Sequence, residues 1–460
     1  MLDAIHWDAD LIRRHDRPGP RYTSYPTAVQ FHGEVGSFDL LHSLRDSRKA
    51  MRPLSLYVHV PFCANICYYC ACNKVITKDR GRALPYLERL EREIELIACH
   101  LDKGQVVEQL HFGGGTPTFL SHDELRRLME HLRQHFNLLD DDSGDYGIEI
   151  DPREADWSTM GLLRELGFNR VSLGVQDLDP EVQHAINRLQ TLEQTRAIVD
   201  AAHALQFRSV NIDLIYGLPR QTPERFARTV DEVIALQPDR LSVFNYAHLP
   251  ERFMPQRRIN ENELPSPAQK LEMLQRSIEQ LTAAGYRYIG MDHFALPDDE
   301  LAMAQEDGTL QRDFQGYTTH GHCDLIGLGV SAISQVGDLY SQNSSDLTNY
   351  QQSLDNDQLA TQRGLHCNDD DRIRRAVIQA LICQFQLDFG DIEKRFAIEF
   401  RSYFSAIWPQ LQQLARDGLI DLHERGIDVR PAGRLLVRSL CMLFDHYLEQ
   451  QNQQRFSRVI

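Results

Sequence analysis

The sequence has few cysteines, no long apolar run and no excess of positive charge. Nine cysteines in 460 residues are too few for a disulfide framework, and the acidic first ten residues contain no hydrophobic signal core. We therefore expect reduced thiols and a cytoplasmic protein. No apolar run reaches the roughly 18 residues that a membrane span needs. A net charge of −17 disfavours binding to nucleic acid or anionic membranes, and an anionic small substrate would need a local cluster of arginines and lysines.

Four of the nine cysteines lie close together, at Cys63, Cys67, Cys70 and Cys72. The first three have the spacing CxxxCxxC, which allows a short loop to turn three thiolates toward one point. A [4Fe–4S] cluster usually takes four cysteine ligands, so three ligands leave one iron with an open position for chemistry. The spacing therefore predicts a catalytic iron–sulfur cluster on Cys63, Cys67 and Cys70.

A structural zinc site is the alternative interpretation of this cysteine group. Zinc modules usually carry two separated ligand pairs, and no second CxxC follows in the sequence. One HxxxH pattern, from His131 to His135, lies far along the chain on a predicted polar helix, and we interpret it as a solvated face. The remaining cysteines are scattered singly and are interpreted as small core residues: Cys99, Cys323, Cys367, Cys383 and Cys441.

From about residue 53, short β-rich runs alternate with helical stretches. The predicted strands are Leu54–Val60, Gln109–Phe112, Gly147–Ile150, Arg170–Val175, Val210–Tyr216 and Arg240–Tyr246. The predicted helices between them include Tyr86–His100, Asp123–His135, Thr191–Leu205 and Pro223–Ala235. Six strand–helix repeats predict an α/β fold in which a parallel sheet curls into a partial (β/α)6 barrel, with ligands at the C-terminal strand ends.

A chain of 460 residues is long enough for two or three domains. Residues 1–50 are polar, and clustered prolines predict an extended N-terminal arm. We expect the barrel and its extension at 51–365, ending in a linker at 355–371 that is rich in Asp, Asn and Gln. Residues 366–460 are predicted to form a smaller, mostly helical domain. Its helix and β-wing near 411–431 resemble a winged helix, but the acidic wing would repel DNA.

Polar residues or glycines end or directly follow all six predicted strands. They are Cys63; Gly113–Pro117; Glu149 and Asp151; Gln176 and Asp177; Asp213 and Gly217; and Asn245, Tyr246 and Ala247. Each one alone could be a turn or cap residue, but the C-terminal ends of parallel strands meet at one edge, so together they predict one site. Glu149 and Asp213 could accept ribose hydroxyls there. The glycine triplet lets the backbone approach a ligand, such as the amino group of a methionine moiety.

Tyr57 and His59 lie on the first strand just before the cysteine loop. Strand alternation places both side chains on one face, so we expect them to line the site. The alternative for His59 is a hydrogen-bonded structural histidine.

The cysteine spacing, with Gly113-Gly-Gly-Thr-Pro117 one strand later, resembles the radical S-adenosylmethionine superfamily. Further motifs narrow the resemblance, over nearly the whole chain, to the oxygen-independent coproporphyrinogen III oxidase family, also called coproporphyrinogen dehydrogenases. They are Gly19–Ala28, Cys70–Lys74, Phe112–Thr118, Ile148–Glu154, Gly174–Asp177, Asn211–Pro219, Gly290–Ala295, Phe314–Thr319 and Arg455–Ile460.

The resemblance implies the oxidative decarboxylation of two propionates of coproporphyrinogen III to vinyl groups, which gives protoporphyrinogen IX in haem synthesis. A 5′-deoxyadenosyl radical, made from S-adenosylmethionine at the cluster, would remove a β-hydrogen from each propionate. Cys63, Cys67 and Cys70 would hold the cluster, whereas Cys72 matches an additional cysteine that is not a ligand. We take as catalytic candidates Tyr57, His59 and Cys72.

The resemblance also implies two S-adenosylmethionine molecules in each chain. The residues that would face the cluster-bound molecule are Tyr57, Gly114, Glu149 and Ile333. Those that would face the second are Tyr69, Gly115, Thr116, Gln176, Arg188, Asp213 and Ala247. Arg21 of the N-terminal arm would cover the substrate and pair with its carboxylates, because a guanidinium matches a carboxylate bidentately.

The implied partners are coproporphyrinogen III and a reduced flavodoxin- or ferredoxin-like electron donor, and we expect a monomer. Two alternative functions stay open. A haem-carrying chaperone shares CxxxCxxC and GGGTP, but such relatives generally lack the N-terminal arm and a cysteine at the position of Cys72. The other alternative is a radical enzyme for another substrate or a simple electron-transfer protein. Electron transfer alone would not need a glycine triplet and polar residues at the ends of six strands.

Overall fold

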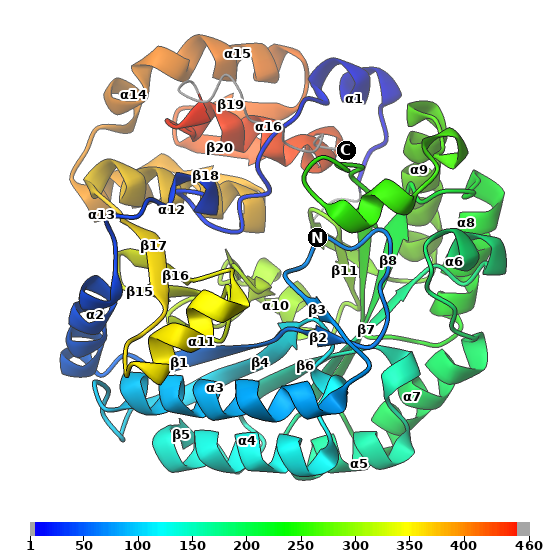
Figure 1. The fold of residues 1–460 in the computed structure, drawn as a ribbon. Helices are drawn as coiled ribbons and strands as arrows, with labels where there is room; N and C mark the ends of the chain where they lie inside the picture. The colour runs from blue at the N-terminus through cyan, green and yellow to red at the C-terminus, as the bar shows by residue number, and fades with distance from the viewer. Residues whose placement is uncertain (1–4, 449–460) are drawn as a thin grey trace. The chain divides into compact units, whose positions relative to one another are not determined.

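The structure is a computed structural model, and it describes residues 5–448. The chain forms two compact units (Figure 1). The larger unit consists of Phe31–Ala284 and His322–His366, and the smaller takes in Met1–Gln30, Gly285–Gly321 and Cys367–Ile460. The motif at Arg455–Ile460 lies outside the described residues.

The larger unit is built on one long sheet whose central strands are parallel. The strand order is β9-β8-β7-β6-β4-β1-β14-β15-β16-β17, and β5 pairs with β4. The strand bounds are β1 Leu54–Val60, β4 Val106–Gly114, β5 Asn137–Leu138, β6 Asp145–Ile150, β7 Arg170–Gln176, β8 Ser209–Tyr216, β9 Arg240–Asn245, β14 Asp324–Leu328, β15 Ile333–Val336, β16 Leu339–Asn343 and β17 Thr361–His366. A separate parallel pair joins β2 Phe62–Cys63 to β3 Val75–Ile76.

Helices connect the parallel strands and cover the outer face of the sheet (Figure 1). Their bounds are α2 Ser37–Ala50, α3 Ala83–Ala98, α4 His122–His135, α5 Trp157–Glu165, α6 Pro180–Ala185, α7 Leu192–Ala204, α8 Pro223–Ile234, α9 Pro267–Ala283 and α11 Leu347–Asp355. Helix α4 is an example of how the sequence determines where a helix begins and which face it buries. Ser121 and Glu124 form a capping box at its start, and one stripe buries Leu125, Leu128 and Leu132.

The six predicted strands are confirmed as β1, β4, β6, β7, β8 and β9, adjacent and parallel in that order. Strand β1 reads Leu-Ser-Leu-Tyr-Val-His-Val and is buried on both faces, as expected for a parallel sheet covered on each side. The sheet extends beyond the prediction, because β14 adds a seventh parallel strand next to β1 and β15 to β17 continue it antiparallel.

The linker expected at 355–371 is wrong over most of its length. Thr361–His366 forms β17, which pairs antiparallel with β16, and Asp369 begins helix α12 after an Asn368 cap. The reason for the error is the position of β17 at the end of the sheet. An end strand is only partly buried, so its polar residues lack the apolar pattern of the central strands.

The smaller unit is largely helical, with two short antiparallel sheets, β12-β13 and β18-β20-β19, and the antiparallel hairpin β10-β11. Its helices are α1 Ala9–His15, α10 Glu300–Glu306, α12 Asp369–Gln384, α13 Phe389–Phe396, α14 Phe400–Tyr403, α15 Trp408–Arg416 and α16 Val437–Cys441. Its strands are β10 Arg287–Gly290, β11 His293–Ala295, β12 Gln311–Asp313, β13 Gly316–Thr318, β18 Gln386–Asp388, β19 Ile420–His423 and β20 Gly426–Val429. Helix α15 followed by the β19–β20 hairpin confirms the predicted helix and wing.

Among the described helices, none combines the length and the apolar character that crossing a bilayer requires.

Candidate active site

The cysteine loop follows β1 and is held by bonds to the protein itself. At its base, β2 and β3 pair in parallel. Farther along the loop, the Tyr68 amide donates to the carbonyl of Ile186 at 2.9 Å. The side-chain amide of Gln256 donates to the carbonyl of Tyr69 at 3.0 Å. The loop conformation is therefore fixed by segments far away in the sequence.

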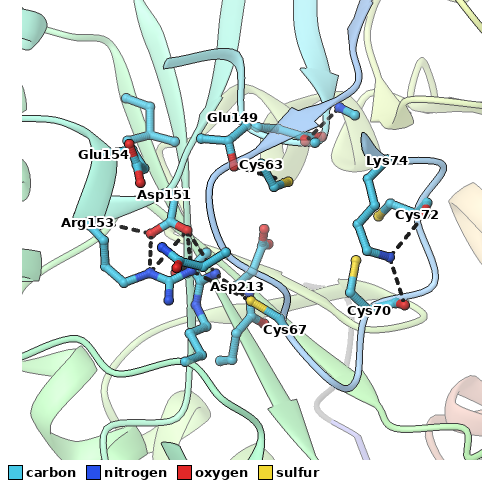
Figure 2. A pocket seen from close by; sticks show the side chains of 18 of the residues that line it. Cys63, Cys67, Cys70, Cys72, Lys74, Glu149, Asp151, Arg153, Glu154 and Asp213 are labelled. Carbon is cyan, nitrogen blue, oxygen red and sulfur yellow. Dashed lines mark hydrogen bonds and ion pairs between the residues drawn. The ribbon is translucent and has the colours of Figure 1, made fainter. Parts of the chain in front are cut away.

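Three thiols of this loop point into one cavity at the C-terminal ends of the parallel strands (Figure 2). They belong to Cys63, Cys67 and Cys70. The hydroxyl of Thr116 donates to Cys63 Sγ at 3.5 Å, and burial raises the pKa of the Cys63 thiol to about 11. Three convergent sulfur atoms suit a soft iron–sulfur centre, whose binding would take the ligands as thiolates and release their protons.

Cys72 lines the same cavity beside Cys70. A hydrogen bond from Cys72 lowers the pKa of Cys70 to about 6, and the same bond raises the pKa of Cys72. Lys74 Nζ donates to the carbonyl oxygens of Cys70 at 3.1 Å and of Cys72 at 3.2 Å, which fixes this end of the loop. Within this pair, ionisation is therefore favoured at Cys70 over Cys72.

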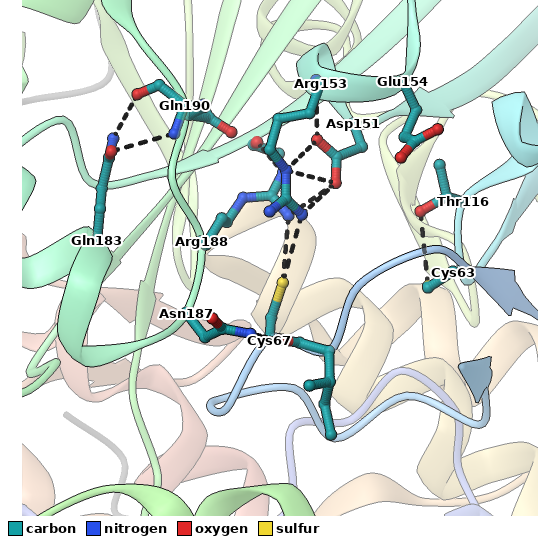
Figure 3. A network of polar contacts seen from close by, with 12 residues as sticks. Cys63, Cys67, Thr116, Asp151, Arg153, Glu154, Gln183, Asn187, Arg188 and Gln190 are labelled. Carbon is teal, nitrogen blue, oxygen red and sulfur yellow. Dashed lines mark hydrogen bonds and ion pairs between the residues drawn. The ribbon is translucent and has the colours of Figure 1, made fainter. Parts of the chain in front are cut away.

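Asp151, just after β6, holds two arginines beside Cys67 (Figure 3). Arg153 Nη2 lies 2.6 Å and Arg188 Nη1 3.1 Å from Asp151 Oδ2. The same nitrogens donate to Cys67 Sγ, at 3.6 Å and 3.5 Å respectively. Burial opposes ionisation of Asp151, yet Arg188 and Arg153 keep its pKa below the usual value. Two cations thus adjoin a single cysteine sulfur.

Arg188 is positioned by the connection between α6 and α7. Its Nη2 donates to the carbonyl of Gly174. The neighbouring Asn187 side chain donates to the carbonyl of Ile66 in the cysteine loop at 2.7 Å. Gln183 and Gln190 close the connection through two hydrogen bonds, as Figure 3 shows. This segment therefore positions Arg188 and the cysteine loop together.

Glu149, at the end of β6, is an ionised acid in the cavity wall. Its Oε1 lies 3.4 Å from His111 Nε2, and its Oε2 accepts from the Gly114 amide at 3.3 Å. Burial opposes ionisation, but these two contacts keep the pKa of Glu149 below its usual value. The Tyr57 ring stacks on His111 with centroids 6.0 Å apart, so Tyr57 reaches Glu149 through His111.

His59 is buried and its hydrogen bonds define its protonation. Its Nε2 lies 3.0 Å from the carbonyl oxygen of Asn73, which can only accept, so this nitrogen carries the proton. Its Nδ1 lies 3.2 Å from the Tyr57 hydroxyl and is the acceptor of that bond. Burial lowers the pKa of His59, which keeps the ring neutral. This bond agrees with the prediction that Tyr57 and His59 share one face of β1, although neither residue is among those that line the cavity.

The glycine triplet Gly113–Gly115 packs closely against neighbouring residues of the larger unit. Gly114 has φ +111°, and a Cβ there would overlap the His59 ring. The Gly115 and Thr116 amides donate to the carbonyls of Val60 and Phe62, both at 2.8 Å. The backbone carbonyls of this segment, which are hydrogen-bond acceptors, are the groups suited to meet an ammonium group.

Asp213, within β8, is the second acid of the cavity. It accepts from Asn211 Nδ2 at 2.8 Å and from the Ser172 hydroxyl at 3.2 Å. Burial raises the pKa of Asp213 to about 6, and the nearby charge of Glu149 adds to that rise.

Most of the sequence-predicted site residues are brought together in this cavity. Those among its lining are Cys63, Cys67, Tyr69, Cys70, Cys72, Gly114, Gly115, Thr116, Glu149, Asp151, Gln176, Arg188 and Asp213. Other predicted positions, though described, are not part of that lining: Arg21, Tyr57, His59, Asp177, Gly217, Asn245, Tyr246, Ala247 and Ile333.

Asp177 is a correction to the strand-end prediction. It is fully buried and accepts from Gln221 Nε2 at 2.6 Å and from the Thr229 hydroxyl at 2.9 Å. The reason is that Gln176 has φ +71°, which turns the chain so that Asp177 enters the core. Asp177 therefore fixes the turn after β7.

Sequence reasoning missed Arg153 and Lys74 as site residues. Arg153 contacts Asp151 and Cys67, and Lys74 fixes the end of the cysteine loop. Arg153 follows Asp151 directly after a predicted strand, so its strand-end position was the available signal.

The donor set fits a [4Fe–4S] cluster and S-adenosylmethionine. Three thiols converge, and the acids and backbone carbonyls near them suit ribose hydroxyls and an ammonium group.

Comparison with protein families gives two matches. Residues 57–233 match the Radical SAM superfamily, and residues 368–436 match the HemN C-terminal domain. The first match covers β1 to α8, which includes the cysteine loop and the acids of the cavity.

Full-length relatives narrow the assignment. The chain is 78% identical to the oxygen-independent coproporphyrinogen III oxidase of Pseudomonas aeruginosa over 460 residues, which is all of both chains. It is 51% identical to the Escherichia coli protein of the same name, again over all of both chains. The solved structure of coproporphyrinogen III oxidase (HemN) from Escherichia coli, described as a radical SAM enzyme, matches with a TM-score of 0.92 and 50% identity. That match covers 97% of this chain and 100% of that one. The chain belongs to the oxygen-independent coproporphyrinogen III oxidase family of radical S-adenosylmethionine enzymes.

Proposed function

We propose that this enzyme converts coproporphyrinogen III to protoporphyrinogen IX by oxidative decarboxylation of two propionates to vinyl groups. The observation that carries the proposal is the convergence of the Cys63, Cys67 and Cys70 thiols on one cavity at the strand ends. The names of full-length relatives at 78% and 51% identity support the substrate.

When bound, the cluster and S-adenosylmethionine supply reductive cleavage to a carbon radical that can remove a β-hydrogen from a propionate. The chain's own residues bind and orient. Cys63, Cys67 and Cys70 hold the cluster, and the guanidinium groups of Arg153 and Arg188 offset the negative charge of the Cys67 thiolate.

We further propose two S-adenosylmethionine molecules in each chain. Glu149 is ionised and suited to accept hydroxyls of the cluster-bound molecule, near Tyr57, Gly114 and Ile333. The second molecule would lie against Tyr69, Gly115, Thr116, Gln176, Arg188, Asp213 and Ala247. All of this second set except Ala247 line the cavity, which supports a common binding surface.

Tyr57, His59 and Cys72 are proposed to act in turnover and not as cluster ligands. The proton on His59 Nε2 is held by the Asn73 carbonyl, and Cys72 is the thiol member of its pair with Cys70. Arg21 is proposed to pair with a substrate carboxylate. We also propose a cytoplasmic monomer, reduced by a flavodoxin- or ferredoxin-like donor, in which the arm 1–50 and the domain 366–460 cover the site.

An anaerobic assay tests the main proposal. Reconstituted protein is mixed with reductant, S-adenosylmethionine and coproporphyrinogen III, and 5′-deoxyadenosine and vinyl product are quantified together. Vinyl product that forms with deoxyadenosine is the expected result. Deoxyadenosine without vinyl product, although a terminal electron acceptor is supplied, would indicate a radical enzyme for another substrate. Neither product, with tight haem binding, would favour a haem-carrying chaperone.

A further inference from the structure

Arg312 is a buried cation in the smaller unit with an incomplete set of partners. Only 6% of the residue is exposed. Its Nε and Nη1 are buried, and within residues 5–448 neither has a hydrogen-bond partner. Native proteins rarely bury an arginine without a carboxylate or carbonyl to accept from it, because an unpaired buried charge is costly. The exception at Arg312 therefore requires an explanation.

The backbone around Arg312 is rigidly held, so its position is not accidental. Arg312 lies in β12, whose hairpin with β13 contains the Phe314–Thr319 motif of the sequence. Gln379 of α12 bonds to both the amide and the carbonyl of Arg312, at 3.1 Å and 2.6 Å. These bonds fix the strand but leave the guanidinium unsatisfied.

The ring of Tyr317 supports one side of the guanidinium. Arg312 pairs across the hairpin with Tyr317, and its Cζ lies 4.7 Å from the ring centroid. Tyr317 is itself fixed, because its hydroxyl donates to the carbonyl of Ile382 at 3.0 Å. Its hydroxyl also fills the space where Gly290 would carry a Cβ. A guanidinium held over a ring face can still direct its N–H groups outward in its own plane, where an acceptor can reach them.

The surroundings of Arg312 carry more positive than negative charge. Arg438 is 3% exposed, and burial together with the charges on Arg21 and Arg312 lowers its pKa to about 10. Asp292, the acid that acts on this group, already pairs with Arg21. Asp313 follows Arg312 in β12, where strand alternation directs it to the other face. One additional anion near Arg312 would offset this excess of positive charge.

Arg438 also holds the N-terminal arm in place. Its Nε donates to the carbonyl of Pro20 at 3.0 Å, and its Nη2 donates to the carbonyl of Gly19. These two residues precede Arg21, so Arg438 is committed to the arm and places Arg21 in the same charged group. On Arg312, by contrast, Nε and Nη1 are buried and have no hydrogen-bond partner among residues 5–448.

We propose that Arg312 is the anchor of a carboxylate-binding site and receives a propionate of the substrate. A guanidinium presents paired N–H donors that match the two oxygens of a carboxylate. Arg21 and Arg438 raise the local positive potential that attracts the anion. The proposal rests on the proposed function for the identity of the ligand, and it assigns a role to a motif that cluster chemistry does not explain.

The test compares Arg312→Met, Arg312→Lys and a control, Arg395→Met, in full-length, cluster-loaded enzyme. Arg395 is an exposed arginine of the same unit that also stacks on a ring, that of Phe396. We expect Arg312→Met to raise KM for coproporphyrinogen III at least tenfold with kcat within about twofold. Arg312→Lys should recover part of the loss, and the control should match the unsubstituted enzyme.

Two further readouts separate binding from a structural role. Fluorescence titration uses coproporphyrin III and its tetramethyl ester, which has no free carboxylate. Arg312→Met should weaken binding of the acid at least tenfold and leave binding of the ester unchanged. The substrate-free variant should melt no lower than the unsubstituted protein, because removing an unpaired buried charge relieves a cost. Equal weakening of acid and ester binding, or an unchanged KM for coproporphyrinogen III, would contradict a carboxylate site at Arg312. Absence of turnover by the unsubstituted enzyme would instead reject the proposed function.

Discussion

A β-carbon added to Gly114 would lie 2.7 Å from Cε1 of His59. The two residues belong to β4 and β1, which pair in parallel, and the glycine has φ +111°, a conformation that L side chains rarely adopt. His59 in turn bonds to Asn73 at the end of the cysteine loop. Packing at Gly114 therefore controls the position of both His59 and the loop.

We expect Gly114→Ala to destabilise the fold by about 2 kcal/mol or more, because it combines backbone strain with a collision at the His59 ring. Urea unfolding measures the loss. Gly161→Ala is the matched control, since Gly161 lies in helix α5 with open space around its Cα, and alanine there should stabilise by about 0.5–1 kcal/mol. Equal effects of the two substitutions would contradict the argument.

Arg153→Met removes one of the two cationic donors to Cys67 Sγ. Hydrogen bonds and positive charge near a cluster sulfur favour the reduced state, so the variant should have a more negative reduction potential. An EPR-monitored redox titration measures it. Arg164→Met, which removes an arginine paired with Asp142, is the control and should leave the potential unchanged. An identical potential in Arg153→Met would show that this donor does not tune the site.

Cys72→Ser should retain cluster iron but lose most turnover, because Cys72 lines the cavity as a fourth cysteine beside the three proposed cluster ligands. Iron content per chain and deoxyadenosine formation are measured together. Cys63→Ser provides the contrast, since loss of a ligand should lower iron content sharply. A Cys72→Ser protein as poor in iron as Cys63→Ser would make Cys72 a ligand.

Asp213 should make stability depend on pH. Burial raises its pKa in the folded protein to about 6, above an unfolded value of about 3.9. The folded state therefore holds the proton more tightly, and the stability this gives is present below about pH 4 and lost as pH rises through about 6. Asp213→Asn mimics the protonated acid and should be more stable at pH 7 by roughly 2 kcal/mol. Urea unfolding at pH 4 and pH 7 measures the difference, and a gain that is equal at both would reject this assignment.

Strand periodicity was sufficient to predict the centre of the fold, since in β1 the apolar residues Leu54, Leu56, Val58 and Val60 occupy alternate positions of a buried strand. It failed at β17, where an end strand carries Thr-Gln-Arg-Gly-Leu-His and buries little. Composition alone does not separate such a strand from a linker.

The sequence was sufficient to predict that the site lies at the strand ends, but not which side chains there enter the cavity. Glu149 and Asp213 occupy the cavity as expected, whereas Asp177 enters the core because Gln176 takes a positive φ. Periodicity gives no warning of a single left-handed residue. Arg153 was missed for a related reason: its contact with Cys67 joins segments 86 positions apart, and no local pattern encodes that pairing.

The anchoring of the cysteine loop determines what remains of the protein when its iron–sulfur cluster is lost. Hydrogen bonds with Ile186 and Gln256 hold the loop, so metal–sulfur bonds are not its sole support. In small zinc domains, by contrast, metal loss unfolds the chain. Here the loss of an oxidised cluster would leave the protein folded. Rebuilding the cluster would then require iron and sulfide but no refolding of the chain.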